Sequence, residues 1–156
     1  GVIRNCEFYN LEMFDCTTGV SISLPVNAED ERWPDQGIEP TRIENLTFKD
    51  ITMEKGYDSL LFIRIGDHKN TLCDTIKDIY FENIKANGAR MPYIVGRKEN
   101  VMQNIVFKNC EFTQIPFEEV DDGENHGSLF HHDKEPHPLE IRFANVNFIN
   151  TKFNLK

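Results

Sequence analysis

Long apolar runs are absent from this chain of 156 residues, which contains no stretch of about eighteen consecutive apolar residues. The sequence therefore predicts no transmembrane helix. Basic residues are also few, since 17 Lys and Arg stand against 26 Asp and Glu, for a formal net charge of −9. This balance argues against a nucleic-acid partner and leaves no basic stripe for binding a membrane surface.

An initiator Met and a signal peptide are also absent. The chain begins at Gly1, with almost no lead-in to its first predicted strand. We expect a processed, truncated or engineered start.

A repeated eleven-residue pattern organises what is present. Residues 43–53 read IENLTFKDITM, and copies of this pattern occupy residues 3–13, 76–86, 102–112 and 143–153. We call these five copies units 1 to 5 in chain order. The third and eighth residues of every unit are Asn or Asp, and the sixth is always Phe, namely Phe8, Phe48, Phe81, Phe107 and Phe148. A repeat of this kind predicts a solenoid, in which each unit buries its apolar face against its neighbours.

The periodicity of the units predicts strands. Apolar residues alternate with polar ones, and Phe, Ile, Val and Thr are common, whereas a helical repeat needs apolar residues at i, i+3, i+4 and i+7. Strands that pair with their own copies in parallel need a crossover, which a chain wound round a cylinder supplies. The sequence thus predicts an all-β parallel β-helix of about five coils. The alternative is an antiparallel sandwich of short strands.

Two side-chain stacks are expected inside this β-helix. The Phe residues at the sixth position predict an internal stack of rings. The Asn or Asp at the eighth position fits a corner, because these residues tolerate left-handed backbone and can hydrogen-bond one another when stacked.

Each coil needs a third strand after its repeat unit. Alternating runs at residues 20–24, 60–65 and 92–95 follow units 1 to 3, and the candidate after unit 4 is residues 128–131. Unit starts are 40, 33, 26 and 41 residues apart, so loops of variable length connect the coils. We expect a single domain over residues 1–156 with long loops at residues 25–40 and 116–138, and loops in a solenoid often gather on one binding face.

The four cysteines are expected to be unpaired. Cys6 and Cys110 fall at inward positions of units 1 and 4, roughly 14 Å apart at the usual strand spacing, which is beyond the reach of a disulfide. Cys16 and Cys73 lie outside the units, and their pairing stays open. Export therefore cannot be inferred from disulfides.

The first long loop holds the only Trp. Trp33 could stack on a sugar ring, because its flat apolar face and polar edge match a pyranose. The alternative is that Trp33 folds back and fills a gap over the coil.

The last long loop is the most polar stretch and contains four of the five histidines. Its spacings match no closed metal motif, so we predict no metal and no cofactor, and a solvated acidic loop is the simplest interpretation. Asp121, Asp122 and His126 are nevertheless candidate catalytic residues, because paired carboxylates carry out glycoside hydrolysis.

The units and the opening GVIRNCEFYNLEM, followed by a Thr-Gly-Val-Ser-Ile strand, resemble the polygalacturonase-like glycosidases, glycoside hydrolase family 28. The resemblance is to coils in the C-terminal half of that family's right-handed parallel β-helix, the pectin lyase-like fold, and it covers residues 1–113 and, more loosely, 139–156. Family members hydrolyse pectic chains with inversion. The resemblance implies a secreted or periplasmic protein that acts on a pectic polysaccharide.

The catalytic motifs of that family, Asn-Thr-Asp, Asp-Asp and Gly-His-Gly, do not appear here in their expected context on a coil. Its substrate-binding Arg-Ile-Lys is also absent, and the nearest match is Arg64-Ile65-Gly66. The resemblance therefore implies that the catalytic half is missing, and it leaves open whether the chain is an enzyme.

Two functions remain open, and an unrecognised lyase or hydrolase that uses the His-rich last loop is a third possibility. The chain is either the C-terminal portion or shortened relative of a pectin-active glycoside hydrolase, contributing carbohydrate binding, or a free-standing β-helix that binds carbohydrate or a protein partner without catalysis. Binding of an acidic polysaccharide would need local cations, and the candidates are Arg64, Arg90, Arg97 and Lys98, which lie on or after third strands. The alternative is that they are ordinary surface charges.

The ends of a solenoid expose backbone and apolar side chains unless they are capped. Because the chain opens directly on a strand, we expect its first coil to be covered by another molecule, with self-association as one possibility, or by the long loops.

Overall fold

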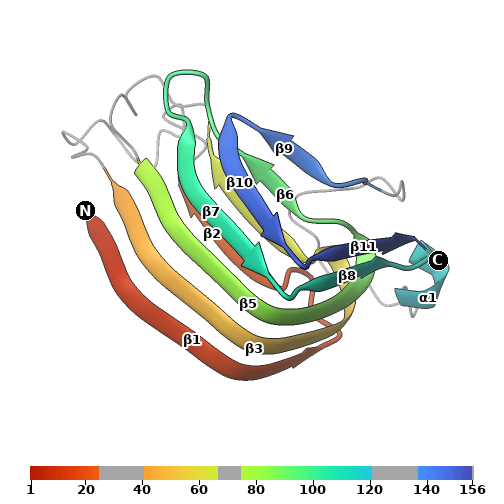
Figure 1. Cartoon of the computed structure of the whole chain (residues 1–156). Helices are drawn as coiled ribbons and strands as arrows, with labels where there is room; N and C mark the ends of the chain where they lie inside the picture. The colour runs from red at the N-terminus through yellow and green to blue at the C-terminus, as the bar shows by residue number, and fades with distance from the viewer. Residues whose placement is uncertain (25–40, 67–74, 121–136, 156) are drawn as a thin grey trace, which may run out of the picture.

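The computed structural model describes residues 1–24, 41–66, 75–120 and 137–155, which form an all-β structure with one short helix (Figure 1). Trp33, Cys73, Asp121, Asp122 and His126 lie outside the described residues. The elements are β1 (Val2–Phe14), β2 (Val20–Leu24), β3 (Arg42–Ser59), β4 (Leu61–Ile65), β5 (Thr75–Arg90), β6 (Tyr93–Val95), β7 (Met102–Lys108), β8 (Glu111–Gln114), α1 (Phe117–Val120), β9 (Glu140–Arg142), β10 (Ala144–Ile149) and β11 (Lys152–Leu155).

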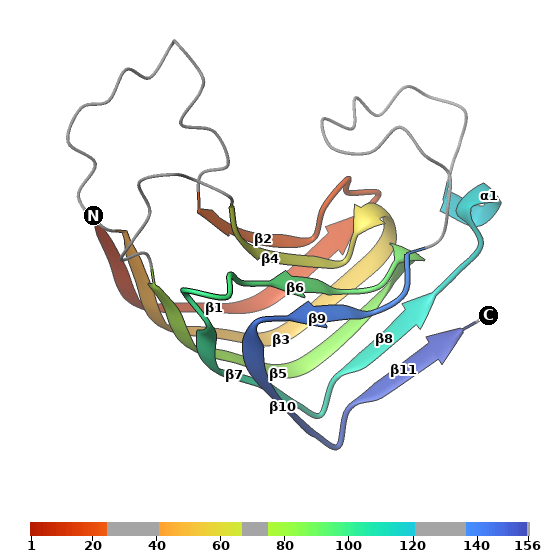
Figure 2. The same ribbon diagram turned by 90° about the horizontal axis from the view of Figure 1, so that it is seen from above.

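The strands form two sheets. The larger has the order β1-β3-β5-β7-β10, with β8 and β11 continuing the layers of β7 and β10, and the smaller has the order β2-β4-β6-β9. Every strand pairing in the described part of the chain is parallel. The antiparallel sandwich is therefore excluded. Seen from above, the larger sheet bends and the smaller sheet lies across its concave side (Figure 2).

The units pair in register, as the repeat predicts. Phe8 lies opposite Phe48, Phe48 opposite Phe81, Phe81 opposite Phe107, and Phe107 opposite Phe148. Successive ring centroids are 4.8, 5.0, 4.7 and 5.3 Å apart, and the rings are stacked. The predicted internal stack is confirmed.

The corners of the units have left-handed backbone. The eighth residue has a positive φ in all five units: Asn10, Asp50, Asn83, Asn109 and Asn150. The third residue does so as well in units 1 to 4, which the sequence analysis did not predict. Asn and Asp are the non-glycine residues that adopt this conformation at least cost. Several stack as hydrogen-bonded ladders, for example Asn45 Nδ2 to Asn5 Oδ1 at 2.8 Å and Asn150 Nδ2 to Asn109 Oδ1 at 2.9 Å.

The third strand after unit 4 was assigned to the wrong residues. β9, residues Glu140–Arg142, pairs with β6 through Ile94 and Ile141, whereas residues 128–131 lie outside the described part of the chain. β9 has only three residues, and only Ile141 within it and Leu139 just before it pack against the core, so its pattern is too short to stand out. The predicted loop also begins with a helical turn, α1, in which Phe117 packs edge-on against Tyr57.

The described cysteines are free. Cys6 and Cys16 are half-buried, and Cys110 is buried. Burial raises the pKa of both the Cys16 and the Cys110 thiols.

The Phe stack predicts a graded response to truncation. Phe107 is 0% exposed with a ring on both faces, so Phe107→Ala should lower the free energy of unfolding by about 3–5 kcal/mol. Phe8 ends the stack and is 42% exposed, so Phe8→Ala should cost only about 1 kcal/mol. Urea unfolding followed by circular dichroism measures both values, and equal losses would contradict the stack.

Candidate functional site

The outward side chains of the smaller sheet form two rows. Period-two alternation buries Leu61, Ile63 and Ile65 of β4 and turns Phe62 and Arg64 outward. Because the strands pair in register, each outward residue meets its counterparts on the neighbouring strands. The rows are Ser21, Phe62, Tyr93 and Glu140, and Ser23, Arg64, Val95 and Arg142.

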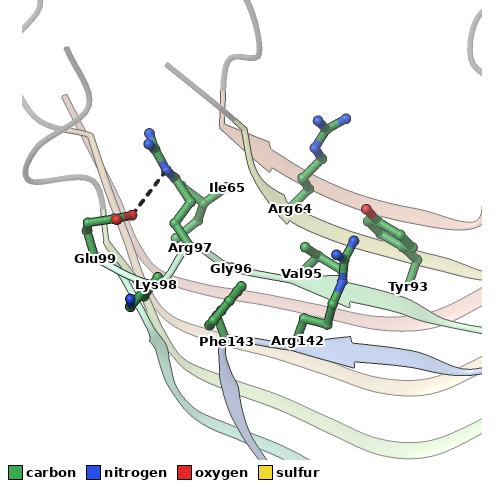
Figure 3. Close-up of a pocket in the computed structure, with 10 residues that line it drawn as sticks. All are labelled: Arg64, Ile65, Tyr93, Val95, Gly96, Arg97, Lys98, Glu99, Arg142 and Phe143. Carbon is green, nitrogen blue, oxygen red and sulfur yellow. Dashed lines mark ion pairs between the residues drawn. The ribbon is translucent and has the colours of Figure 1, made fainter. Parts of the chain in front are cut away.

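A depression lies at one end of these rows (Figure 3). It has a volume of about 290 Å³. Its lining comes from β4, β6, β9 and the loop after β6: Arg64, Ile65, Tyr93, Val95, Gly96, Arg97, Lys98, Glu99, Arg142 and Phe143. The depression therefore combines residues from three successive strands of the smaller sheet and the segments that follow them.

The loop between β6 and β7 positions two of the cations. Arg97 N donates to Asn100 O at 3.2 Å and Asn100 N donates to Arg97 O at 3.1 Å, which makes a tight turn. Gly96 N donates to Arg142 O at 2.9 Å. A Cβ at Gly96 would collide with the carbonyl oxygen of Phe143, so the close approach of this loop to β9 requires glycine.

Four cations surround the depression, and Glu99 is the one carboxylate among the described residues that line it. Arg97 Nε lies 3.8 Å from Glu99 Oε2, and Arg142 Nε lies 2.7 Å from Glu140 Oε1. Neither Arg64 nor Lys98 forms an ion pair with a described residue. In Figure 3 the guanidinium groups of Arg64, Arg97 and Arg142 extend to the same side of the ribbon. Positive charge is thus concentrated locally on a chain whose net charge is −9.

Two aromatic rings lie beside these cations. Phe62 and Tyr93 are stacked, with centroids 5.2 Å apart and an interplanar angle of 9°. Tyr93 lines the depression next to Arg142 (Figure 3). The pair offers an apolar surface with a hydroxyl at its margin.

The structure brings together three of the four cations that the sequence analysis singled out, Arg64, Arg97 and Lys98, and adds Arg142. Arg142 was missed because the third strand of its coil was assigned to residues 128–131. The only sequence signal for this strand is Glu-Ile-Arg at residues 140–142, where a single apolar residue lies between two charged ones.

Arg90 lies elsewhere. It is buried, and its Nη1 donates to Asp58 Oδ1 at 2.9 Å. A buried guanidinium already bonded to a carboxylate cannot reach a ligand on the outer face, so we remove Arg90 from the candidate set.

The groups with shifted pKa values lie away from the depression in the described part of the chain. A hydrogen bond from Lys108, together with the charge of Lys49, lowers the pKa of Glu82 on the larger sheet. Cys16 and Cys110, whose pKa values are raised, do not line the depression either.

Within residues 1–24, 41–66, 75–120 and 137–155, no group of three or more His, Cys, Asp or Glu side chains could hold a metal ion. The described helix is too short to cross a membrane. Comparisons of the chain with protein-family models, curated proteins and solved structures found no match.

Substitution of Arg90 should destabilise the protein strongly, whereas substitution of Arg64 should have little effect on its stability. Arg90→Met leaves the Asp58 carboxylate buried without its cation and should lower the free energy of unfolding by about 3–5 kcal/mol. Arg64→Met removes a half-buried side chain that forms no ion pair with a described residue, and it should change the free energy of unfolding by less than about 0.5 kcal/mol.

Urea denaturation of both variants checks this expectation. The double variant Arg90→Met, Asp58→Asn should recover part of the loss, because it leaves no uncompensated charge. A stable Arg90→Met single variant would contradict the assignment of Arg90 to the interior.

Proposed function

We propose that this chain is a right-handed parallel β-helix that binds an acidic polysaccharide, of the pectic type, on the outer face of β4, β6 and β9. The parallel pairing of the five units, which aligns the Phe at the sixth position of each, supports the β-helix. The observation that carries the binding function is the group of four cations around one depression, next to a stacked aromatic pair.

The spacing of the cations favours a polymer over a small anion. Arg64 pairs with Val95, and Val95 with Arg142, so the two arginines lie two strands apart, or roughly 10 Å. This is a separation of backbone positions, and Arg97 and Lys98 extend the row of cations beyond it. A chain of uronic acid residues presents a carboxylate on each sugar and can contact both arginines at once.

The aromatic pair suits the remaining surface of such a ligand. Pyranose rings have apolar C–H faces, which pack against aromatic rings, and hydroxyls, which hydrogen-bond to groups such as the Tyr93 phenol. Arg64 and Lys98 need not give up an ion pair with a described residue to bind a sugar carboxylate.

The depression is suited to binding rather than to hydrolysis. An inverting glycosidase uses two carboxyl groups about 6.5–9.5 Å apart, one as acid and one as base. Among the described residues lining the depression, Glu99 is the only carboxylate, and Arg97 lies beside it. We therefore propose a carbohydrate-binding portion or shortened relative of a polygalacturonase-like glycosidase, working outside the cytoplasm, where such polymers occur.

Calorimetric titration with a galacturonic acid oligomer tests the proposal. We expect binding to the acidic oligomer, weaker binding as salt is raised, and none to the fully methyl-esterified oligomer, which lacks the charge. Arg64→Met should raise Kd about tenfold, which corresponds to the loss of one charge-assisted hydrogen bond.

Arg42→Met is the matched control, because Arg42 is exposed on β3 in the other sheet. It should leave Kd unchanged. Equal affinity for the acidic and esterified oligomers, or equal effects of the two substitutions, would refute the binding face. Release of reducing ends by the wild-type chain would refute the assignment as a binding module.

A further inference from the structure

The first residue of unit 5 does not occupy the place that the repeat assigns to it. In units 2 to 4 the first position holds a buried apolar side chain, such as Ile76. In unit 5, however, Ala144 and not Phe143 lies opposite Met102, the first residue of unit 4. Ala144 packs against the core in that place. Phe143 is thereby displaced from the row of inward side chains.

The backbone of Phe143 is also unusual. Its φ is 49°, which lies in the left-handed region and is a rare conformation for a bulky aromatic residue. The other non-glycine residues with a positive φ in the described ranges are Asn or Asp, apart from Lys55. Backbone strain of this kind persists where the surrounding structure imposes it, and it is found most often at functional sites.

Contacts with the preceding layer of strands hold Phe143 in this conformation. Met102 N donates to Phe143 O at 3.0 Å, and Gly96 N donates to Arg142 O at 2.9 Å. Gly96 has no Cβ, which allows its backbone to approach Phe143 O closely. These partners belong to β7 and to the loop before it. The backbone of Phe143 is therefore fixed from the side on which the depression lies.

Phe143 lines the depression together with the four cations. In Figure 3 it lies between Lys98 and Arg142. Its side chain is exposed, so the ring is open to a ligand. Arg142 Nε lies 2.7 Å from Glu140 Oε1, and the guanidinium group has further N–H donors besides that one. The site thus places an apolar ring between two cationic groups.

A uronic acid matches this arrangement within a single sugar. Its carboxylate is attached directly to the pyranose ring, and the C–H groups of that ring form an apolar face that packs against aromatic side chains. A flexible polyanion, such as an oligomer of glutamic acid, carries carboxylates but has no ring face. Cations alone attract both ligands, whereas an aromatic ring beside the cations favours the sugar.

We propose that Phe143 makes the depression selective for uronic acid sugars over other polyanions, a role that rests on the function proposed above. The Phe143 ring packs against the apolar face of one sugar, while Lys98 and Arg142 bind the carboxylate of that sugar. Phe143 is then a specificity-determining residue of the binding site, which accounts for an exposed aromatic side chain on strained backbone.

Calorimetric titration at low salt with two ligands of equal charge, a galacturonic acid oligomer and a glutamic acid oligomer, tests the proposal. The wild-type chain should bind the sugar oligomer about tenfold more tightly. Phe143→Asn removes the ring but suits the left-handed backbone, so it should bind the two ligands about equally. Phe143→Tyr is the matched control, because it keeps a ring and should keep the selectivity. Unchanged selectivity in Phe143→Asn would overturn the proposal.

Urea unfolding separates a role in binding from a role in packing. Phe143→Asn should not lower the urea midpoint, because Asn adopts this backbone at less cost than Phe and the Phe143 side chain is exposed. A lower midpoint would indicate that the ring is retained for packing, and it would overturn the proposal.

Arg64→Met distinguishes the role of Phe143 from the binding function on which it rests. If the wild-type chain binds the galacturonic acid oligomer and Arg64→Met raises Kd, while Phe143→Asn leaves Kd unchanged, the binding face stands and the role of Phe143 is wrong. If the wild-type chain binds neither oligomer, the proposed function is refuted, and the role of Phe143 is refuted with it.

Discussion

The left-handed backbone at the third and eighth positions of units 1 to 4 gives these units the same bent shape, and the other features of the structure depend on that shape. In units 1 to 4, Asn or Asp at both positions has a φ between 52° and 57°. These bends lie at the same places in units 1 to 4, so these four units have the same shape and stack in register. Unit 5 shows that the register depends on the positions of these bends. There, the positive φ falls on Phe143 and not on Asn145, and the pairing of β10 with β7 shifts between Ala144 and Val146.

The register of the strand pairing in turn determines which side chains meet in the interior and on the surface. One apolar residue repeated at the sixth position becomes a column of stacked rings, and one amide at a corner becomes a directional ladder of hydrogen bonds. On the smaller sheet, the parallel pairing of β4, β6 and β9 brings Arg64, Arg97 and Arg142 together from segments that are far apart in sequence. The binding face that we propose follows from this one repeated geometry.

Much of the fold could be predicted from the sequence because the repeat is visible as identical residues at matched positions. The parallel pairing, the ring stack and the eighth-position corners follow from it. The third-position corners were missed, since an Asn within an alternating strand pattern does not by itself signal a bend. The strand β9 was missed because three residues carry too little periodicity, and Arg142 was missed with it. Arg90 looked like a surface cation because its partner, Asp58, lies 32 residues earlier in the chain. Pairings at that distance depend on tertiary packing that no local pattern reports.

The most direct test of this account is a nuclear Overhauser experiment on the chain with isotope-labelled Phe. Rings in neighbouring units lie 4.7–5.3 Å apart, so the account predicts contacts between Phe48 and Phe81, between Phe81 and Phe107, and between Phe107 and Phe148. Rings two units apart should show no contact, because the strands that carry them are separated by about 9.6 Å. A direct contact between Phe48 and Phe107, or the absence of contacts between neighbouring rings, would contradict the in-register stack of units and everything that depends on it.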